Sequence, residues 1–327
     1  MDLRQEYIAC VYCVFVKARH LLFMILLMSS SLHVRGVANS WGYQLQNYDI
    51  EALKAFDAQL IVMDYSKDGS DAGAFSASEI SDIQSTGKTL VSYISIGEAE
   101  DYRYYFDQTW LTNPPSWLDS ENPNWEGNYK VRYWDSEWQS IVYDYIDKII
   151  SAAFDGIYLD IVDGYEFYQD SVPDAAELMV DFVSNISEYA KNKAGSEFLI
   201  IPQNGEGLLS STSYRSVIDA IGKEDLYLEN DGKTKKTDEK NNSEKMLDLL
   251  IADSKPVYLV EYTSDTASIS YVKEQASSKG YTLYIGTRDL DRLVSQSFTT
   301  SESSSLLLIP SLIALVVVRK IFSHKSN

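Results

Sequence analysis

Acidic and amide side chains recur in this 327-residue chain at one kind of position, the end of a short apolar run. Eight such runs end with, or are soon followed by, polar residues: Gln44 and Gln46, Asp64, Glu98 and Glu100, Asp160 and Asp163, Gln203 and Asn204, Glu224, Glu261, and Arg288 with Asp289. Any one of them could simply cap a helix. Carboxylates that meet in one pocket, however, raise one another's pKa, a cost that usually marks a functional site. The chemistry therefore depends on whether the fold brings these residues together.

The apolar runs are predicted to be strands, because they are short, rich in β-branched and aromatic residues, and separated by amphipathic helical stretches. The predicted strands cover residues 41–46, 60–64, 89–96, 156–160, 198–203, 217–221, 257–261 and 282–285. Helical patterns cover residues 76–86, 138–153, 175–194, 242–252 and 266–278, and Ser76 with Glu79 has the form of a capping box. This alternation is typical of a parallel sheet.

Eight strands over roughly 250 residues match the size of an α/β fold of the (β/α)8 type, a single-domain TIM barrel over residues 39–294. In such a barrel the C-terminal ends of all strands meet at one rim, so the polar residues are predicted to converge there. The alternative is a doubly wound open sheet. That fold would need a glycine-rich phosphate-binding turn after an early strand, and the sequence has none.

Composition narrows the classes of partner. Asp and Glu number 48 against 28 Lys and Arg, for a net charge of −20, which disfavours nucleic acid as a partner. Three His and two Cys leave little from which to build a zinc or iron–sulfur site, so no metal and no cofactor are predicted. The alternative is that the acidic rim binds Mg²⁺ or Ca²⁺, because carboxylate oxygens suit hard cations.

Both ends of the chain differ from the middle. Residues 1–38 have the order of a signal peptide, with basic residues before the apolar run Leu21–Met28 and small residues up to Ala38; an uncleaved anchor is the alternative. Residues 295–305 are predicted to be a Ser/Thr-rich linker. Residues 306–327 are predicted to be a membrane anchor or sorting signal, with a buried core helix as the alternative.

The body is therefore expected outside the cell, secreted or tethered to the surface, with membrane contact through the terminal segments only. Residues 1–38 and 301–327 each carry a net charge of +2, which leaves −24 for the residues between them. A surface with that charge attracts cationic polymers and repels acidic ones.

Several segments of the predicted barrel form a familiar series. They are WGYQLQN at 41–47, VMDY at 62–65, YISIGEAEDYR at 93–103, GNYKVRYW at 127–134, FDGIYLDIVD at 154–163 and IPQNGE at 201–206. The sequence resembles glycoside hydrolase family 114, the endo-α-1,4-polygalactosaminidase family, and most closely its branch of extracellular prokaryotic barrel proteins. The resemblance covers residues 39–293. Compared with the shorter polygalactosaminidases, this branch has extra rim sequence, for example residues 101–133.

The resemblance implies a TIM barrel that cleaves glycosidic bonds in galactosamine-rich polysaccharide. The family's catalytic Asp, after its fourth strand, corresponds to Asp160, and its catalytic Glu, after the sixth strand, corresponds best to Glu224. Glycoside cleavage needs one carboxylic acid to protonate the leaving oxygen and one carboxylate to attack the sugar or activate water. We expect Asp160 to be the nucleophile or base and Glu224 the acid. The sequence leaves retention and inversion open, because the carboxyl separation decides between them.

Further rim residues are predicted to bind substrate. Acidic side chains would hold sugar amines, amides would hold hydroxyl groups, aromatic rings would stack on sugar faces, and an arginine would orient the carboxylates. These residues are Asp64, Glu98, Glu100, Asp163 and Glu261; Gln44, Gln203 and Asn204; Tyr65, Tyr129 and Trp134; and Arg103. The alternative function is a non-catalytic carbohydrate-binding surface protein on the same barrel, since a fold does not fix a function.

Overall fold

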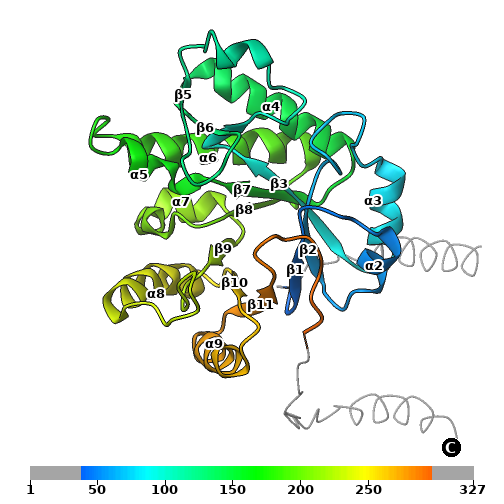
Figure 1. Ribbon diagram of the computed structural model, residues 1–327, viewed down its shortest axis with the longest axis vertical. Coiled ribbons are helices and arrows are strands. Elements are labelled where there is room, and N and C mark those ends of the chain that lie inside the picture. Colours follow the sequence, from blue (N-terminus) through cyan, green and yellow to red (C-terminus); the bar gives the residue numbers. More distant parts are fainter. Residues whose placement is uncertain (1–37, 297–327) are drawn as a thin grey trace, which may run out of the picture. The chain divides into compact units, whose positions relative to one another are not determined.

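Eight parallel strands form the centre of the computed structural model, which describes residues 38–296 (Figure 1). They are β1 (Trp41–Tyr43), β2 (Leu60–Asp64), β3 (Thr89–Ser95), β7 (Gly156–Asp160), β8 (Leu199–Pro202), β9 (Ile221–Glu224), β10 (Val257–Tyr262) and β11 (Thr282–Gly286). The first five form one parallel sheet in chain order, and β9, β10 and β11 form a second.

Contacts at two seams join these sheets into a barrel. At one seam Gln203 pairs in parallel with Gly222, which links the end of β8 to β9. At the other, the indole N–H of Trp41 on β1 donates to the carbonyl of Thr282 on β11 over 2.9 Å. The predicted (β/α)8 barrel is thereby confirmed, and the open doubly wound sheet is wrong for this chain.

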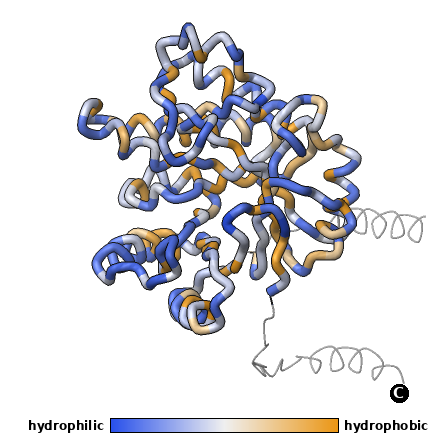
Figure 2. The backbone as a smooth tube through the Cα atoms, viewed as in Figure 1, coloured by the Kyte–Doolittle hydropathy of each residue, from blue (hydrophilic) through white to orange (hydrophobic). Residues whose placement is uncertain are grey.

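Helices cover the outside of the strands, and their apolar faces explain why (Figures 1 and 2). The helices between barrel strands are α2 (Ile50–Ala55), α3 (Ala77–Gln84), α4 (Ser136–Ser151), α6 (Ala175–Ala194), α7 (Thr212–Val217), α8 (Thr237–Ala252) and α9 (Thr266–Lys279). The predicted capping box is present at the start of α3, where Ser76 and Glu79 bond to each other's backbone N–H groups. In α4, Trp138, Val142 and Ile149 are buried along one face.

The barrel is interrupted between β3 and β7 by a small antiparallel sheet. It consists of β4 (Glu98–Glu100), β5 (Leu118–Glu121) and β6 (Asn128–Val131), in the order β4-β6-β5, with the 3-10 helix η1 (Gln108–Leu111) between β4 and β5. We call it the rim sheet. Its strands β5 and β6 and the helix η1 lie within the extra sequence expected at residues 101–133, and the sheet starts three residues after the end of β3.

The sixth strand differs from its prediction. Residues 217–221 were expected to form it, but Val217 ends helix α7, which Ser211 caps by accepting a hydrogen bond from the Tyr214 N–H over 3.3 Å. Val217 and Ile218 are β-branched residues, which are common in strands, but here they lie at the end of the helix and in the turn that follows. The strand itself, β9, begins at Ile221 and ends at Glu224. Glu224 is thus the last residue of a barrel strand rather than part of the loop beyond it.

Aromatic rings fill the inside of the barrel. Trp41 lies 5.6 Å from Tyr258 and 5.8 Å from Tyr284, measured between ring centroids, and Tyr43 lies 5.3 Å from Tyr158. All of these side chains are buried. The interior is therefore a packed core, as in other barrels of this type, and it leaves the rim as the place for chemistry.

The predictions for the ends of the chain fall almost wholly outside the described residues. These are the signal peptide at 1–38, the linker at 295–305 and the anchor or sorting signal at 306–327. Between residues 38 and 296, none of the helices is both long enough and apolar enough to cross a membrane.

Candidate active site

Asp160 is the last residue of β7, where both of its carboxylate oxygens are held. The hydroxyl of Tyr93, on the neighbouring strand β3, donates to Oδ2 over 2.8 Å. The backbone N–H of Ile161 donates to Oδ1, also over 2.8 Å. The side chain is partly exposed at the rim of the barrel, and these two hydrogen bonds fix its rotamer.

Glu224 ends β9 and is held in a similar way. The amide nitrogen of Gln203 donates to Oε2 over 2.6 Å, and the hydroxyl of Tyr262 donates to Oε1. The orientation of the Gln203 amide is set in turn, because its oxygen accepts a hydrogen bond from Tyr43 over 3.0 Å. The side-chain oxygen of Asn204 accepts the backbone N–H of Glu224 over 3.1 Å. The predicted residues Gln203 and Asn204 thus lie beside Glu224.

Burial and nearby charges shift the pKa of both carboxyl groups upwards. Burial raises the pKa of Asp160 well above its ordinary range, and the negative charges of Glu224 and Asp163 raise it further. Burial also raises the pKa of Glu224, although the hydrogen bond from Tyr262 and the positive charge of Arg288 oppose this shift.

The chain turns sharply directly after three residues of this site. Seven non-glycine residues among those described adopt the left-handed conformation, which is rare for them, and three of the seven follow Asp160, Gln203 and Glu224 directly: Ile161 (φ 57°), Asn204 (φ 55°) and Asp225 (φ 48°). For a β-branched residue such as Ile161 the conformation costs roughly 1–3 kcal/mol. Gly97 packs so closely on the Ile161 carbonyl that a methyl group there would overlap it. Strain that the surroundings enforce in this way clusters at active sites.

Asp163 lies just beyond Asp160, in the 3-10 helix η2 (Val162–Gly164), and is partly exposed. Burial and the charge of Glu166 raise its pKa to about 6, while Lys223 opposes the shift. The ammonium group of Lys223 lies 3.1 Å from the carboxylate of Glu206. Lys223 therefore adds one positive charge beside Asp163, Glu166 and Glu206, so this part of the rim keeps a net negative charge.

Asp64, Glu100 and Arg103 form a buried ion cluster instead of facing the open rim. The guanidinium of Arg103 donates to Asp64 over 2.8 Å and to Glu100 over 2.6 Å. A third hydrogen bond of Arg103 goes to Tyr145 over 2.9 Å. The guanidinium carbon lies 5.8 Å from the centre of the Tyr93 ring, so the cluster supports the residue that holds Asp160. The expectation that Arg103 orients carboxylates fits this geometry.

Glu98 and Gln44 are buried, and their polar atoms are engaged within the protein. Glu98 accepts a hydrogen bond from Asn122 over 2.8 Å on the inner side of the rim sheet. Gln44 donates to the backbone carbonyls of Gln46 and Asn47 over 2.9 and 3.2 Å, and so stabilises the turn after β1. Their predicted role in substrate binding stays a prediction.

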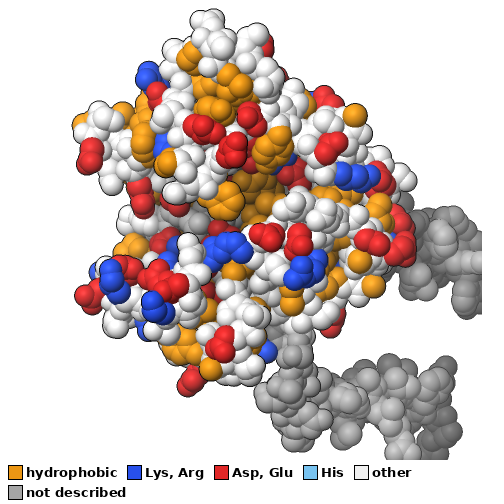
Figure 3. Space-filling view, viewed as in Figure 1, with side chains coloured by type: hydrophobic (Ala, Val, Ile, Leu, Met, Phe, Trp, Pro, Cys, Tyr) orange, Lys and Arg blue, Asp and Glu red, His pale blue; other side chains and the backbone are white. Residues whose placement is uncertain are grey.

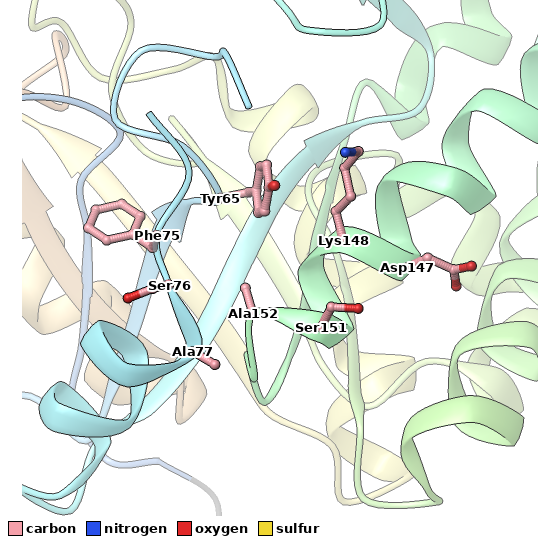
Figure 4. Close-up of a pocket in the computed structure, with 8 residues that line it drawn as sticks. All are labelled: Tyr65, Phe75, Ser76, Ala77, Asp147, Lys148, Ser151 and Ala152. Atoms are coloured by element: carbon pink, nitrogen blue, oxygen red, sulfur yellow. The ribbon is translucent and has the colours of Figure 1, made fainter. Parts of the chain in front are cut away.

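Of the predicted aromatic residues, Tyr129 and Trp134 lie on or next to the rim sheet, and Tyr65 lies elsewhere. Tyr129 is on β6, half-buried, with its ring 5.7 Å from that of Phe106. Tyr65 lines a cavity of about 360 Å³ with residues of α3 and α4, among them Lys148 (Figure 4). The described structure therefore does not place Tyr65 with the carboxylate pair.

Glu261 is wholly buried and supports a loop. Its Oε1 accepts the backbone N–H of Tyr227 over 2.7 Å, which ties β10 to the segment that follows β9. Its Oε2 has no hydrogen-bond partner among the described residues. Burial raises the pKa of Glu261 to about 8. The raised pKa favours the neutral form of this side chain, and its predicted role in substrate binding stays a prediction.

The Glu261 carboxyl makes a testable contribution to stability. A group whose pKa is raised by folding stabilises the folded state below its unfolded pKa, and this contribution is lost as the pH rises towards the folded value. We therefore expect a loss of ~1.4 kcal/mol per pH unit from this group between its ordinary pKa of 4.5 and about 8. Glu261→Gln, measured by urea unfolding from pH 5 to 9, should have a flatter profile than the wild type. The exposed Glu274→Gln is the control; parallel profiles for all three proteins would contradict the assignment.

The hydroxyl donors Tyr93 and Tyr262 were missed in the sequence. Both stand at strand positions, and side chains alternate between the two faces of a strand. The predicted strand stopped at Glu261, but β10 continues to Tyr262, so that Tyr262 and not Glu261 faces Glu224. This alternation was the available signal for Tyr262. For Tyr93, the register Tyr93–Tyr158 and Ser95–Asp160 between β3 and β7 would have been needed.

The outer surface is hollowed near the site. In the space-filling view a hollow lies over β7 and β8, with apolar side chains at its bottom and Asp and Glu side chains on its border (Figure 3). The described residues contain no group of three or more His, Cys, Asp or Glu side chains that could hold a metal ion. The arrangement can perform acid and base chemistry on a ligand that enters from the rim.

Acidic residues at the C-terminal rim of a (β/α)8 barrel are compatible with glycoside hydrolysis, which uses two carboxyl groups. The model of glycoside-hydrolase family GH114 matches residues 28–302, and the chain belongs to this family. It is a glycoside hydrolase, as the resemblance implied.

The chain also has relatives along most of its length, and solved structures share its fold. The chain is 42% identical to a protein of Methanocaldococcus jannaschii over 77% of each chain, and 34% identical to one of Deinococcus radiodurans over 78% of this chain and 82% of the relative. Its fold is similar to the glycoside hydrolase domain of PelA from Pseudomonas aeruginosa (TM-score 0.63, 15% identity, 79% of this chain and 98% of that one). It is also similar to Aspergillus fumigatus Ega3, solved with galactosamine (TM-score 0.62, 17% identity, 79% and 94%).

Proposed function

We propose that this protein is an extracellular hydrolase of amino-sugar polysaccharide, with α-1,4-linked galactosamine as the favoured substrate, and that Asp160 and Glu224 carry the reaction. The observation that carries the proposal is the coupling of these two carboxyl groups, each held at the rim by two hydrogen-bond donors. Family membership supports the reaction class. The galactosamine in the complex of Ega3 supports the choice of sugar.

In the proposed reaction Glu224 protonates the leaving glycosidic oxygen. Asp160 either attacks the anomeric carbon or activates a water molecule, according to the carboxyl separation in the bound state. The donors Tyr93 and Gln203 hold the two carboxylates in place, so little reorganisation is needed during the reaction.

This division of roles requires Asp160 to be ionised and Glu224 to be protonated when the glycosidic bond breaks. The transition state of glycoside cleavage has oxocarbenium character, and its positive charge develops beside the attacking carboxylate. That charge favours an ionised Asp160 and leaves the proton for Glu224. A cationic amino sugar near Asp160 acts in the same direction, because it lowers the cost of ionising a carboxyl group that has acidic neighbours.

The charge of the molecule fits a cationic substrate. The residues between the terminal segments carry a net charge of −24, and Asp163 adds a carboxylate next to Asp160. Such a surface attracts a de-N-acetylated polysaccharide at long range. The proposed location outside the cell rests on the signal-like order of residues 1–38 and on the apolar C-terminal segment.

The pH dependence of activity follows from the raised pKa values of the pair. One proton must be present and one absent, so we expect kcat/KM to be bell-shaped. Both pKa values are shifted upwards from 3.8 and 4.5, because both groups are buried and Asp160 is also repelled by Glu224 and Asp163. The acidic limb, set by the ionisation of Asp160, should therefore lie above pH 3.8. An acidic limb at or below pH 3.8 would contradict the raised pKa of Asp160.

The proposed substrate is tested by incubation of the purified protein with α-1,4-galactosaminan, its N-acetylated form, chitosan and pectin, followed by sizing of the products. We expect short oligosaccharides from galactosaminan and none from pectin. Binding of galactosaminan without any cleavage would overturn the hydrolase in favour of the carbohydrate-binding alternative. Cleavage of pectin alone would overturn the choice of amino sugars.

A further inference from the structure

A second cavity lies between the rim sheet and the short helix α5 (Tyr165–Tyr168), away from the carboxylate pair. Its volume is about 510 Å³, within the ~300–1,000 Å³ typical of small-molecule sites. The rim sheet and its flank contribute Asp119, Arg132 and Trp134, and α5 contributes Phe167 and Tyr168. Since η2 and α5 directly follow Asp160, the cavity is connected to the candidate active site through a short, continuous segment.

Aromatic rings form the apolar wall of this cavity. The Trp134 and Phe167 rings each pack edge-on against Tyr168, with centroid distances of 4.8 Å. Phe167 is 53% exposed, although a large apolar side chain normally packs inside. Rings held at right angles to each other offer a flat face with a wall beside it. That shape suits the apolar face of a sugar ring and a small apolar substituent on it.

The polar part of the cavity is a charge-balanced pair. Arg132 donates to the two oxygens of Asp119 over 3.0 and 3.1 Å, and the hydroxyl of Tyr168 donates to Asp119 over 2.9 Å. The Arg132 side chain remains 48% exposed, so it has donors left for a ligand. Unlike the surroundings of Asp160, this pair carries no net charge.

We propose that this cavity binds a second sugar ring of the same polysaccharide, and that it prefers an N-acetylated ring to one with a free amine. The inference rests on the proposed function. A neutral acetamido group places its methyl against the aromatic wall and its polar atoms against the Asp119–Arg132 pair. An ammonium group on the sugar would find no net negative charge to pair with in this cavity. It would also be repelled by the Lys130 ammonium, which lies only 4.9 Å from the centre of the Phe167 ring. The enzyme would thus recognise a partly acetylated chain by two sites of different charge.

The test is a calorimetric titration of oligosaccharides into the Asp160→Asn protein, in which the substitution prevents cleavage. The probes are galactosamine oligomers in N-acetylated and de-N-acetylated form. Phe167→Ala should weaken binding of the acetylated oligomer by about 10-fold, because one aromatic contact is lost. Arg132→Lys should also weaken it, because the planar fork is lost while the charge remains. The control is Leu111→Ala. Leu111 is an exposed apolar residue of η1 outside the cavity, and its replacement should leave the affinity for both oligomers unchanged.

The outcomes separate this inference from the proposed function. Unchanged affinity in Phe167→Ala and Arg132→Lys, with cleavage by the wild type intact, would overturn the second site and leave the hydrolase standing. Weakened binding in both variants, with no cleavage by the wild type, would support the site and overturn the hydrolase. A larger loss for the de-N-acetylated oligomer than for the acetylated one would overturn the preference for an N-acetylated ring.

Discussion

Asp160→Asn and Glu224→Gln are each expected to lower the rate of polysaccharide cleavage by about 10³-fold, the middle of the ~10²–10⁴ range for a positioned acid or base. Each substitution keeps the size and the hydrogen-bond acceptor of the side chain but removes its ability to exchange a proton. The rate is measured as new reducing ends released from galactosaminan at saturating concentration. A variant that keeps more than a tenth of the wild-type rate would exclude that residue from the reaction.

The fold of these variants provides a check that is independent of activity. The pKa of Asp160 is raised by burial and by neighbouring carboxylates, so a neutral Asn relieves repulsion at neutral pH. We expect the Tm of Asp160→Asn to equal or exceed that of the wild type. Asp170→Asn, at an exposed aspartate near the same rim, is the matched control and should retain both activity and Tm.

Arg103→Met is expected to cost about 3–5 kcal/mol of the free energy of unfolding, the largest stability effect we predict. The Arg103 guanidinium is buried between Asp64 and Glu100, with distances of 2.8 and 2.6 Å. Without the guanidinium, the two buried carboxylates have no cation nearby, so nothing compensates the free-energy cost of removing their charges from water. Urea unfolding at pH 7 measures the loss.

Two further variants separate this effect from a general loss of packing. Arg292→Met removes an arginine whose side chain is 63% exposed, and it should cost less than about 0.5 kcal/mol. Arg103→Met combined with Asp64→Asn and Glu100→Gln removes all three charges together, so it should recover part of the loss. A loss below about 1 kcal/mol in Arg103→Met alone would show that the cluster is not a buried ion network.

The barrel could be predicted from the sequence because its signals are local. Seven of the eight strands were found within a few residues, since each is a short apolar run between helical patterns. The sixth failed because Val217 and Ile218 have the side chains of a strand, whereas the cap at Ser211 places Val217 in a helix.

The candidate site could be predicted only in part. Whether a carboxylate is buried or open to the rim depends on which side chains from other parts of the chain pack against it. Asp64, Glu98, Glu100 and Glu261 lie at or near strand ends, as Asp160 does, yet each of the four is buried. Arg103 lies 39 residues from Asp64 in sequence, and no spacing rule links them. The donors Tyr93 and Tyr262 likewise depend on strand register, which forms only with the sheet.

The roles of Asp160 and Glu224 are tested most directly by comparing two leaving groups. The substrates are a galactosamine oligomer with a nitrophenyl leaving group, which departs without protonation, and the natural polysaccharide, which needs an acid. We predict that Glu224→Gln cleaves the nitrophenyl substrate within about tenfold of the wild-type rate while it fails on the polysaccharide, and that Asp160→Asn fails on both. Equal loss on both substrates in Glu224→Gln, or cleavage of either substrate by Asp160→Asn at more than a tenth of the wild-type rate, would contradict the account.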